Sequence, residues 1–135
     1  MRSFDSQWAE ARAGGGEDLF TGSPRTQLEL LYLHRARQVL GFLEQRFDNR
    51  RLRTVEVGCG RGTVSQHLAA AGHQVVLLDA SADALALARD NFARHGLAAE
   101  YVKGDAEALP FPDGGFDFAF SLGLLEHFDD PSTIV

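Results

Sequence analysis

Residues Val55–Ser65 read VEVGCGRGTVS and decide the fold of this 135-residue chain. An apolar run leads into three glycines at alternate positions, and a helical pattern follows them. This order predicts a strand, a glycine-rich turn and a helix. Glycine in such a turn tolerates positive φ and lets a ligand approach the backbone closely. The following helix presents free N–H groups and the positive end of its dipole. The stretch therefore predicts a nucleotide-type cofactor site at the carboxyl end of a parallel strand.

The glycine spacing and one acidic residue narrow the choice of cofactor. Dinucleotide-binding turns usually read G-x-G-x-x-G, whereas this turn reads G-x-G-x-G and follows Glu56. A carboxylate repels a pyrophosphate but suits the cationic amino group of S-adenosylmethionine. At these residues the chain resembles the class I S-adenosylmethionine-dependent methyltransferases, whose first motif reads D/E-x-G-x-G-x-G. The resemblance assigns cofactor binding to Glu56, Gly58, Cys59, Gly60 and Gly62.

A glycine-rich turn can also be purely structural, so the other segments matter. The second match, VVLLDAS at 75–81, predicts a buried strand that ends in Asp79. Asp79 follows the turn at close to the roughly 20-residue offset of a ribose-binding acid. Its carboxylate can accept hydrogen bonds from both ribose hydroxyls. The alternative is an N-cap for the next helix, which Ser81 fills better. By resemblance, Ala80 also contacts the cofactor.

The third match, VKGDAEALPF at 102–111, resembles the adenine-contacting segment of the family. The resemblance implies that Asp105 bonds the exocyclic amine of adenine. It also implies that the backbone N–H of Ala106 bonds a ring nitrogen. The alternative is a turn aspartate that bonds its own backbone.

The fourth match, FPDGGFDFAFSLGLLEHF at 111–128, combines a turn signal with alternating phenylalanines that predict a strand. By resemblance the end of this strand, Ser121 and Leu122, lies against the methionine part of the cofactor. The "LEH" stretch that follows resembles small-molecule methyltransferases, including those of ubiquinone and menaquinone biosynthesis. Glu126 and His127 are candidates for a catalytic base. Both residues also fit ordinary roles, His127 as a structural side chain and Glu126 as a solvated charge.

Composition argues against several classes of protein. The chain carries 13 Lys and Arg against 19 Asp and Glu, a net charge of −6, which does not suit a nucleic-acid partner. Its one cysteine, Cys59, excludes an internal disulfide and suits a reducing compartment, so we expect a cytoplasmic protein. The sequence lacks the long apolar run of a membrane span and the apolar core of a signal peptide. We expect no metal site.

Strands that alternate with helices predict an α/β fold, a Rossmann-like parallel sheet with helices on both faces. Residues 1–24 look irregular and form either a lid, as is common in the family, or a flexible tail. As a lid, they would offer the aromatic side chains of Phe4, Trp8 and Phe20, with Tyr32 beyond them. Residues 25–135 form a partial S-adenosylmethionine-binding methyltransferase domain. The expected helices are 25–47, 62–71 and 81–95, and the expected strands are 52–58, 74–79, 99–103 and 116–121.

The resemblance covers the first four strands of a seven-strand domain. We therefore expect a fragment of a longer protein, or a partner that covers the fourth strand. Without such a cover, the apolar edge of that strand favours self-association. The implied activity is methyl transfer to a small-molecule acceptor that the protein positions near attack distance. A non-catalytic S-adenosylmethionine-binding module and an NAD-dependent oxidoreductase remain alternatives, although the turn spacing, Glu56 and the Asp105 segment disfavour the second.

Overall fold

The computed structural model describes residues 4–13 and 18–122. These residues contain a four-stranded sheet with the strand order β3-β2-β1-β4, and every strand pair in it is parallel. The predicted parallel α/β architecture is confirmed. Along the chain the elements are α1 (Phe4–Ala13), α2 (Gln27–Phe47), β1 (Arg53–Val57), α3 (Thr63–Ala70), β2 (Gln74–Asp79), α4 (Ala82–Arg94), β3 (Glu100–Lys103) and β4 (Phe118–Phe120).

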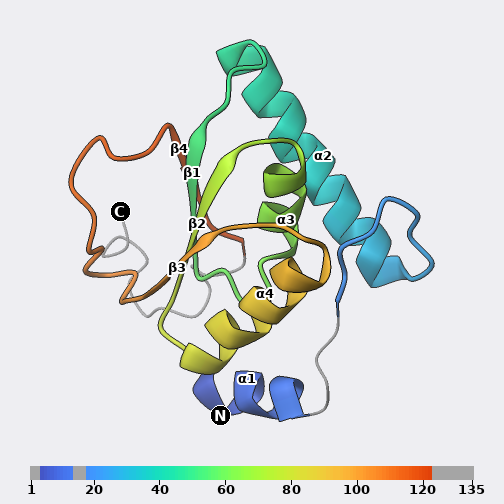
Figure 1. Cartoon of the computed structure of the whole chain (residues 1–135), viewed down its shortest axis with the longest axis vertical. Coiled ribbons are helices and arrows are strands. Elements are labelled where there is room, and N and C mark those ends of the chain that lie inside the picture. The colour runs from blue at the N-terminus through green and yellow to red at the C-terminus, as the bar shows by residue number, and fades with distance from the viewer. Residues whose placement is uncertain (1–3, 14–17, 123–135) are drawn as a thin grey trace.

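The helices α2, α3 and α4 pack on one face of the sheet, on the same side in Figure 1. Leu43, Leu68, Leu77 and Phe92 are almost fully buried in the core on that face. We also expected helices on the second face. Among the described residues that face, which includes Val55 and other branched side chains of β1 and β2, is covered by the segment 104–117.

The helix α2 begins and ends with recognisable caps. The hydroxyl of Thr26 accepts a hydrogen bond from the backbone N–H of Glu29 at 3.1 Å, which satisfies a free donor of the first turn. At the other end Asp48 takes the left-handed conformation with φ 54° and donates its N–H to the carbonyl of Glu44. The helix therefore starts two residues later than predicted and ends where predicted.

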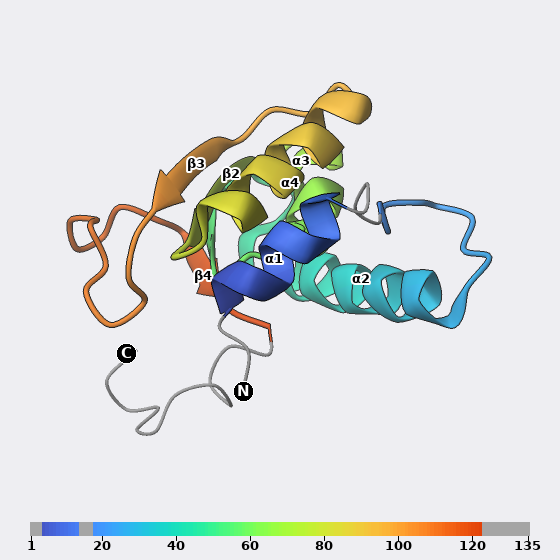
Figure 2. The same cartoon turned by 90° about the horizontal axis from the view of Figure 1, so that it is seen from below.

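The expectation that residues 1–24 are irregular is wrong for residues 4–13, which form α1. The segment contains alanine, glutamate, glutamine and arginine and no glycine or proline, which favours a helix. The helix packs against α4, and Arg12 forms an ion pair with Asp83 at 3.3 Å. Figures 1 and 2 show α1 beside α4, at the end of the sheet where the strands finish. The side chain of Phe4 lies outside the description.

The fourth strand is shorter than predicted because its first residues bond differently. Asp117 donates its backbone N–H to the carbonyl of Arg53 at 2.8 Å. Its carboxylate accepts the backbone N–H of Arg53, also at 2.8 Å. The ladder with β1 begins at Phe118, and within the described sheet β4 is an edge strand, as expected. In the part of the chain described, no helix is both long and apolar enough to cross a membrane.

Candidate functional site

The predicted glycine turn joins β1 to α3. Gly58, Gly60 and Gly62 all have positive φ, at 70°, 53° and 71°, a conformation that side-chain-bearing residues rarely adopt. At Gly62 packing adds a second constraint, because a Cβ would lie 3.1 Å from Leu77 and 3.2 Å from Phe92. The turn therefore depends on glycine both for its backbone path and for the close approach of α3 to the sheet.

Asp79 ends β2 next to this turn, because β1 and β2 are paired in parallel. Its Oδ2 atom accepts a hydrogen bond from the N–H of Gly60 at 3.0 Å. Its Oδ1 atom accepts one from the N–H of Ser81 at 2.9 Å. Ser81 itself caps α4, since its hydroxyl accepts the N–H of Ala84 at 3.2 Å. The buried carboxylate thus links the ends of two strands, and the serine is the helix cap.

Glu56 is buried at the end of β1, 4% exposed. The hydroxyl of Ser65 donates a hydrogen bond to its Oε1 atom at 2.6 Å. Burial raises the pKa of the Glu56 carboxyl to about 8; hydrogen bonds from Ser65 lower it and the charge of Asp79 adds to the rise. In this fold the carboxyl is therefore mainly protonated at neutral pH, and an approaching cation would favour its ionised form.

A cavity of about 100 Å³ lies against the turn. It is far smaller than the roughly 300–1,000 Å³ of typical ligand pockets, because α1 closes over it. A Cβ on Gly60 would come within 2.6 Å of the indole of Trp8, so the two residues are in direct contact. The guanidinium of Arg61 lies 5.4 Å from the centre of the same indole. The cavity is lined by Trp8, Tyr32, Glu56, Gly58, Cys59, Gly60, Arg61, Gly62, Thr63, Val64 and Leu122.

Cys59 is the buried residue between the first two glycines. Burial raises the pKa of its thiol, and the nearby carboxylates Glu56 and Asp79 act in the same direction. The thiol therefore stays protonated and unreactive. Its role in the turn is that of a small packed side chain.

The segment after β3 carries Asp105 and Ala106. The carboxylate of Asp105 accepts the backbone N–H of Glu107 at 2.9 Å, and its carbonyl accepts that of Ala108 at 3.0 Å. This is the local turn bonding named above as the alternative to adenine binding. The Asp105 side chain is exposed, so its carboxylate can still accept a ligand donor. Ala106 is buried among the valines of the second sheet face.

Other predicted residues divide between the site and its surroundings. Leu122 lines the cavity, and the hydroxyl of Ser121 is buried with no hydrogen-bond partner among the described residues. Ala80 is exposed immediately after Asp79. Glu126 and His127 lie outside the described residues. Phe20 does not lie at the turn; it packs between His67 and His95 near the far ends of α3 and α4.

Sequence reasoning missed several side chains of the site, among them Ser65 and Arg61. Both stand inside the stretch that predicted the turn, Arg61 between two glycines and Ser65 on the first turn of α3. The helical position of Ser65, nine residues after Glu56, was the available signal for their contact.

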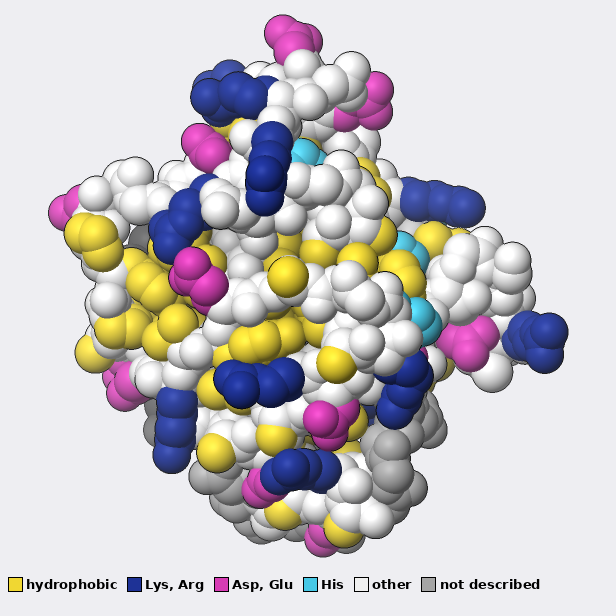
Figure 3. Space-filling view, viewed as in Figure 1, with side chains coloured by type: hydrophobic (Ala, Val, Ile, Leu, Met, Phe, Trp, Pro, Cys, Tyr) yellow, Lys and Arg dark blue, Asp and Glu magenta, His cyan; other side chains and the backbone are white. Residues whose placement is uncertain are grey.

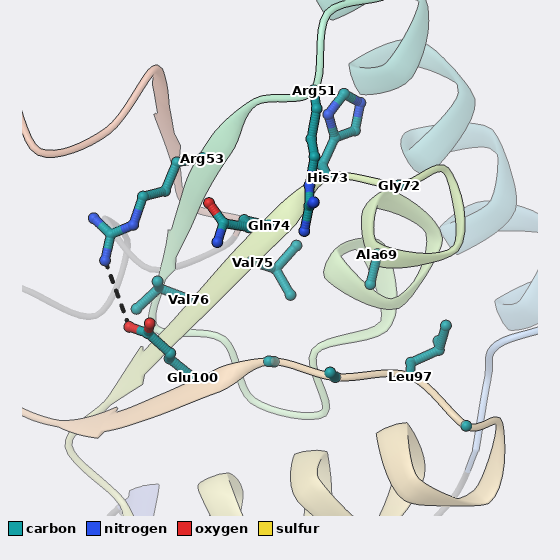
Figure 4. Close-up of a pocket in the computed structure, with 13 residues that line it drawn as sticks. Arg51, Arg53, Ala69, Gly72, His73, Gln74, Val75, Val76, Leu97 and Glu100 are labelled. Carbon is teal, nitrogen blue, oxygen red and sulfur yellow. Dashed lines mark hydrogen bonds and ion pairs between the residues drawn. The ribbon is translucent and has the colours of Figure 1, made fainter.

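A larger hollow of about 570 Å³ lies at the opposite, amino end of the strands. Figure 4 shows Arg51, His73 and Gln74 around it, with Arg53 paired to Glu100. Figure 3, viewed from the same side as Figure 1, shows basic side chains beside hydrophobic surface. Ligands of open α/β sheets bind beyond the carboxyl ends of the strands. The motif residues gather at the carboxyl end. We therefore take the cavity at the glycine turn as the candidate site, although it is smaller than the hollow at the amino end.

Comparison with known proteins agrees with this geometry. A family model described as a methyltransferase domain matches residues 54–134. A ubiquinone biosynthesis O-methyltransferase of Ralstonia nicotianae is 39% identical over 84 residues, which cover 62% of this chain and 35% of that protein. A malonyl-[acyl-carrier protein] O-methyltransferase of Erwinia pyrifoliae is 44% identical over 79 residues, 58% of this chain and 29% of that protein. The chain thus spans about a third of the length of these curated relatives.

Solved structures share the fold. A protein from Pyrococcus horikoshii superposes with a TM-score of 0.67 at 28% identity, over 82% of this chain and 50% of that chain. A candidate S-adenosyl-L-methionine-dependent methyltransferase of Methanococcus maripaludis superposes with a TM-score of 0.75 at 23% identity, over 99% of this chain and 57% of that chain. With the motif residues gathered at the carboxyl ends of β1 and β2, the family match identifies this chain as a member of the class I S-adenosylmethionine-dependent methyltransferases.

Proposed function

We propose that the chain binds S-adenosylmethionine at the carboxyl ends of β1 and β2, and that the protein it represents transfers the methyl group to a small molecule. The observation that carries this proposal is the bond between Asp79 and the N–H of Gly60, at 3.0 Å. It brings the ribose-binding acid expected from the sequence against the glycine turn. A nucleoside with a short amino-acid tail can place its ribose at the Asp79 carboxylate and its tail along the glycine turn.

Each part of the cofactor has a proposed partner. Glu56 faces the ammonium group, and Asp79 accepts hydrogen bonds from the ribose hydroxyls. The segment Asp105–Ala106 holds adenine, with Ala80 beside it. The methionine part lies between the glycine turn and the residues after β4, Ser121 and Leu122. The burial of Glu56 and Asp79 beside the turn, and the positive φ of its glycines, support these roles.

The chemistry of such a site is mainly positioning. Bound S-adenosylmethionine supplies a sulfonium methyl that is already activated for in-line displacement. The chain's own residues fix its direction, hold the acceptor near attack distance and exclude water. Walls of low polarity, such as Leu122 and Trp8, favour a transition state in which the positive charge on sulfur is being lost. Glu126 and His127 remain the candidates for a base.

We propose that α1 acts as the lid of this site. Trp8 contacts Gly60, and the ion pair of Arg12 with Asp83 fixes the helix on α4. The indole occupies space from which a ligand would approach the turn, so α1 moves when the cofactor enters. We therefore propose a lid rather than a flexible tail for this segment.

For the acceptor we propose the oxygen of a small molecule. The two named relatives are both O-methyltransferases, one of ubiquinone biosynthesis and one acting on malonyl-[acyl-carrier protein]. We place the reaction in the cytoplasm, where the buried thiol of Cys59 stays reduced. We also propose that the chain self-associates through the edge of β4, which carries the half-buried side chains of Phe118 and Phe120.

Calorimetric titration with S-adenosylhomocysteine, the product form of the cofactor, tests this proposal against both alternatives. We expect one-to-one binding, and no heat on titration with NAD. Binding of NAD in place of S-adenosylhomocysteine would support the oxidoreductase. If S-adenosylhomocysteine binds, radiolabelled methyl transfer to phenolic and carboxylate acceptors, measured with the longest available form of the protein, separates the enzyme from a non-catalytic module.

A further inference from the structure

Arg61 lies in the glycine turn and carries a buried donor that no described residue pairs. It stands between Gly60 and Gly62, both with positive φ, and lines the same cavity as Glu56. Its Nε atom is buried, and no described residue accepts a hydrogen bond from it. An unpaired buried donor on a charged group is costly. The guanidinium is therefore suited to an anion that the free chain does not supply.

Among the described residues, the guanidinium of Arg61 lies near an aromatic ring. It lies 5.4 Å from the centre of the Trp8 indole, in a cation–π arrangement. Such a contact is weaker than a charge-assisted hydrogen bond to a carboxylate. The indole thus lies beside the guanidinium without accepting a hydrogen bond from its buried Nε atom. A ligand carboxylate that enters the cavity can replace or add to this contact.

The cavity is lined by one acidic residue, Glu56, and one basic residue, Arg61. Glu56 offers a carboxyl that an incoming cation would favour in its ionised form, and Arg61 offers a planar fork of N–H donors. Among the described residues no ion pair joins them to each other. An α-amino acid carries an ammonium and a carboxylate on one carbon atom. The cavity is complementary to that pair of charges.

We propose that Arg61 binds the α-carboxylate of the cofactor and so selects ligands that carry a complete amino-acid end. This inference rests on the proposed function, because it takes S-adenosylmethionine as the ligand. It adds Arg61 to the proposed cofactor-binding residues; Arg61 stands at a variable position of the motif, between Gly60 and Gly62.

The competing explanation is that Arg61 only braces Trp8 over the turn. A brace would affect every ligand of the site equally. A carboxylate partner would affect only ligands that possess the carboxylate. Decarboxylated S-adenosylhomocysteine distinguishes the two, because it keeps the adenosine, the thioether and the amine and lacks only the carboxylate.

The experiment measures the dissociation constants of both ligands for the wild-type chain, Arg61→Met and Arg61→Lys. Arg89→Met is the matched control, because Arg89 also stacks on an aromatic ring, that of Tyr101 at 4.7 Å, and does not line the cavity. We expect Arg61→Met to weaken S-adenosylhomocysteine about tenfold or more and to leave the decarboxylated ligand unchanged. Arg61→Lys should recover part of the loss, and Arg89→Met should change neither ligand. Circular dichroism spectra check that each variant is folded.

Equal loss of both ligands in a folded Arg61→Met variant, or loss of neither, would overturn the inference. The wild-type chain gives a test that does not depend on how the variants fold. It must bind S-adenosylhomocysteine about tenfold or more tightly than the decarboxylated ligand, and equal affinities would overturn the role of Arg61 while leaving the proposed function intact. If the wild-type chain binds neither ligand, the proposed function fails together with the inference.

Discussion

The carboxylate of Asp79 accepts the backbone N–H of Gly60 at 3.0 Å, and this bond fastens the end of β2 to the glycine turn that follows β1. A second bond from the N–H of Ser81 holds the other oxygen at 2.9 Å. Both strands end at the same edge of the sheet, so one buried carboxylate orders two loops there. The relationship makes Asp79 both a structural residue and the proposed ribose acceptor.

Replacing Asp79 tests both of these roles. We expect Asp79→Ala to weaken S-adenosylhomocysteine binding roughly tenfold or more, through loss of charge-assisted hydrogen bonds. It should also lower the free energy of unfolding by about 1–3 kcal/mol, because two buried N–H groups lose their acceptor. Calorimetry and urea unfolding measure the two effects. Asp79→Asn, which keeps one acceptor oxygen, should be intermediate in both; unchanged affinity in the folded alanine variant would remove the ribose assignment.

A substitution at Gly60, the turn glycine that contacts the Trp8 indole, tests whether the turn is the site. We expect Gly60→Val to abolish S-adenosylhomocysteine binding, since its Cβ would lie 2.6 Å from Trp8 and the residue has φ 53°. Gly96→Val is the matched control, because Gly96 also has positive φ, 66°, and its Cβ would meet nothing within 4 Å. Both variants carry backbone strain, and only the first blocks the site. Normal binding by folded Gly60→Val would show that the turn is not the site.

The buried carboxyl of Glu56 predicts a pH dependence of stability. Its pKa in the folded chain is about 8, above the ordinary 4.5, because burial disfavours the charged form. Between these values the folded chain holds a proton that the unfolded chain releases, so the contribution of Glu56 to the free energy of unfolding falls as pH rises from 4.5 to 8 and levels off above 8. Below pH 4.5 the carboxyl is protonated in both states.

Glu56→Gln isolates this contribution. Burial lowers the pKa of His67 and His73, whose effect on stability has the opposite slope below pH 6.5. We therefore expect the difference in unfolding free energy, wild type minus Glu56→Gln, to decline between pH 4.5 and 8. A flat difference would mean that Glu56 ionises in the folded chain as it does in the unfolded chain.

Trp8 is the only tryptophan of the chain, so its fluorescence reports on the lid. The indole contacts Gly60 and Arg61 in the cofactor-free fold. We expect saturating S-adenosylhomocysteine to change the emission of Trp8, because the ligand has to approach Gly60 from the side that the indole covers. If binding occurs by calorimetry and the emission stays the same, α1 is not a moving lid.

The sequence could predict those features of the fold that neighbouring residues in the chain determine. The strand, turn and helix around Val55–Ser65 follow from apolar patterning and glycine spacing over eleven residues, and the structure confirms them. Asp79 could also be predicted, because it ends an apolar run at a recognisable offset. Its bond to the N–H of Gly60 could not, since that depends on the pairing of β1 with β2.

Other features depend on contacts that no local pattern carries. The helix α1 is short and precedes a run of glycines, and its position comes from Trp8 on Gly60 and Arg12 on Asp83. The late start of β4 comes from Asp117, whose backbone N–H and side-chain carboxylate both bond the backbone of Arg53. The cofactor roles of Asp105, Ser121 and the other predicted residues remain predictions.

Nitrogen-15 NMR of individual glycine amides, followed during titration with S-adenosylhomocysteine, shows at which end of the sheet the ligand binds. We expect the signals of Gly58, Gly60 and Gly62 to shift with one common dissociation constant. The signals of Gly72 and Gly96, which line the hollow at the opposite end of the sheet, should stay in place. Shifts at Gly72 and Gly96 without shifts in the turn would contradict the account and move the site to the other end of the strands.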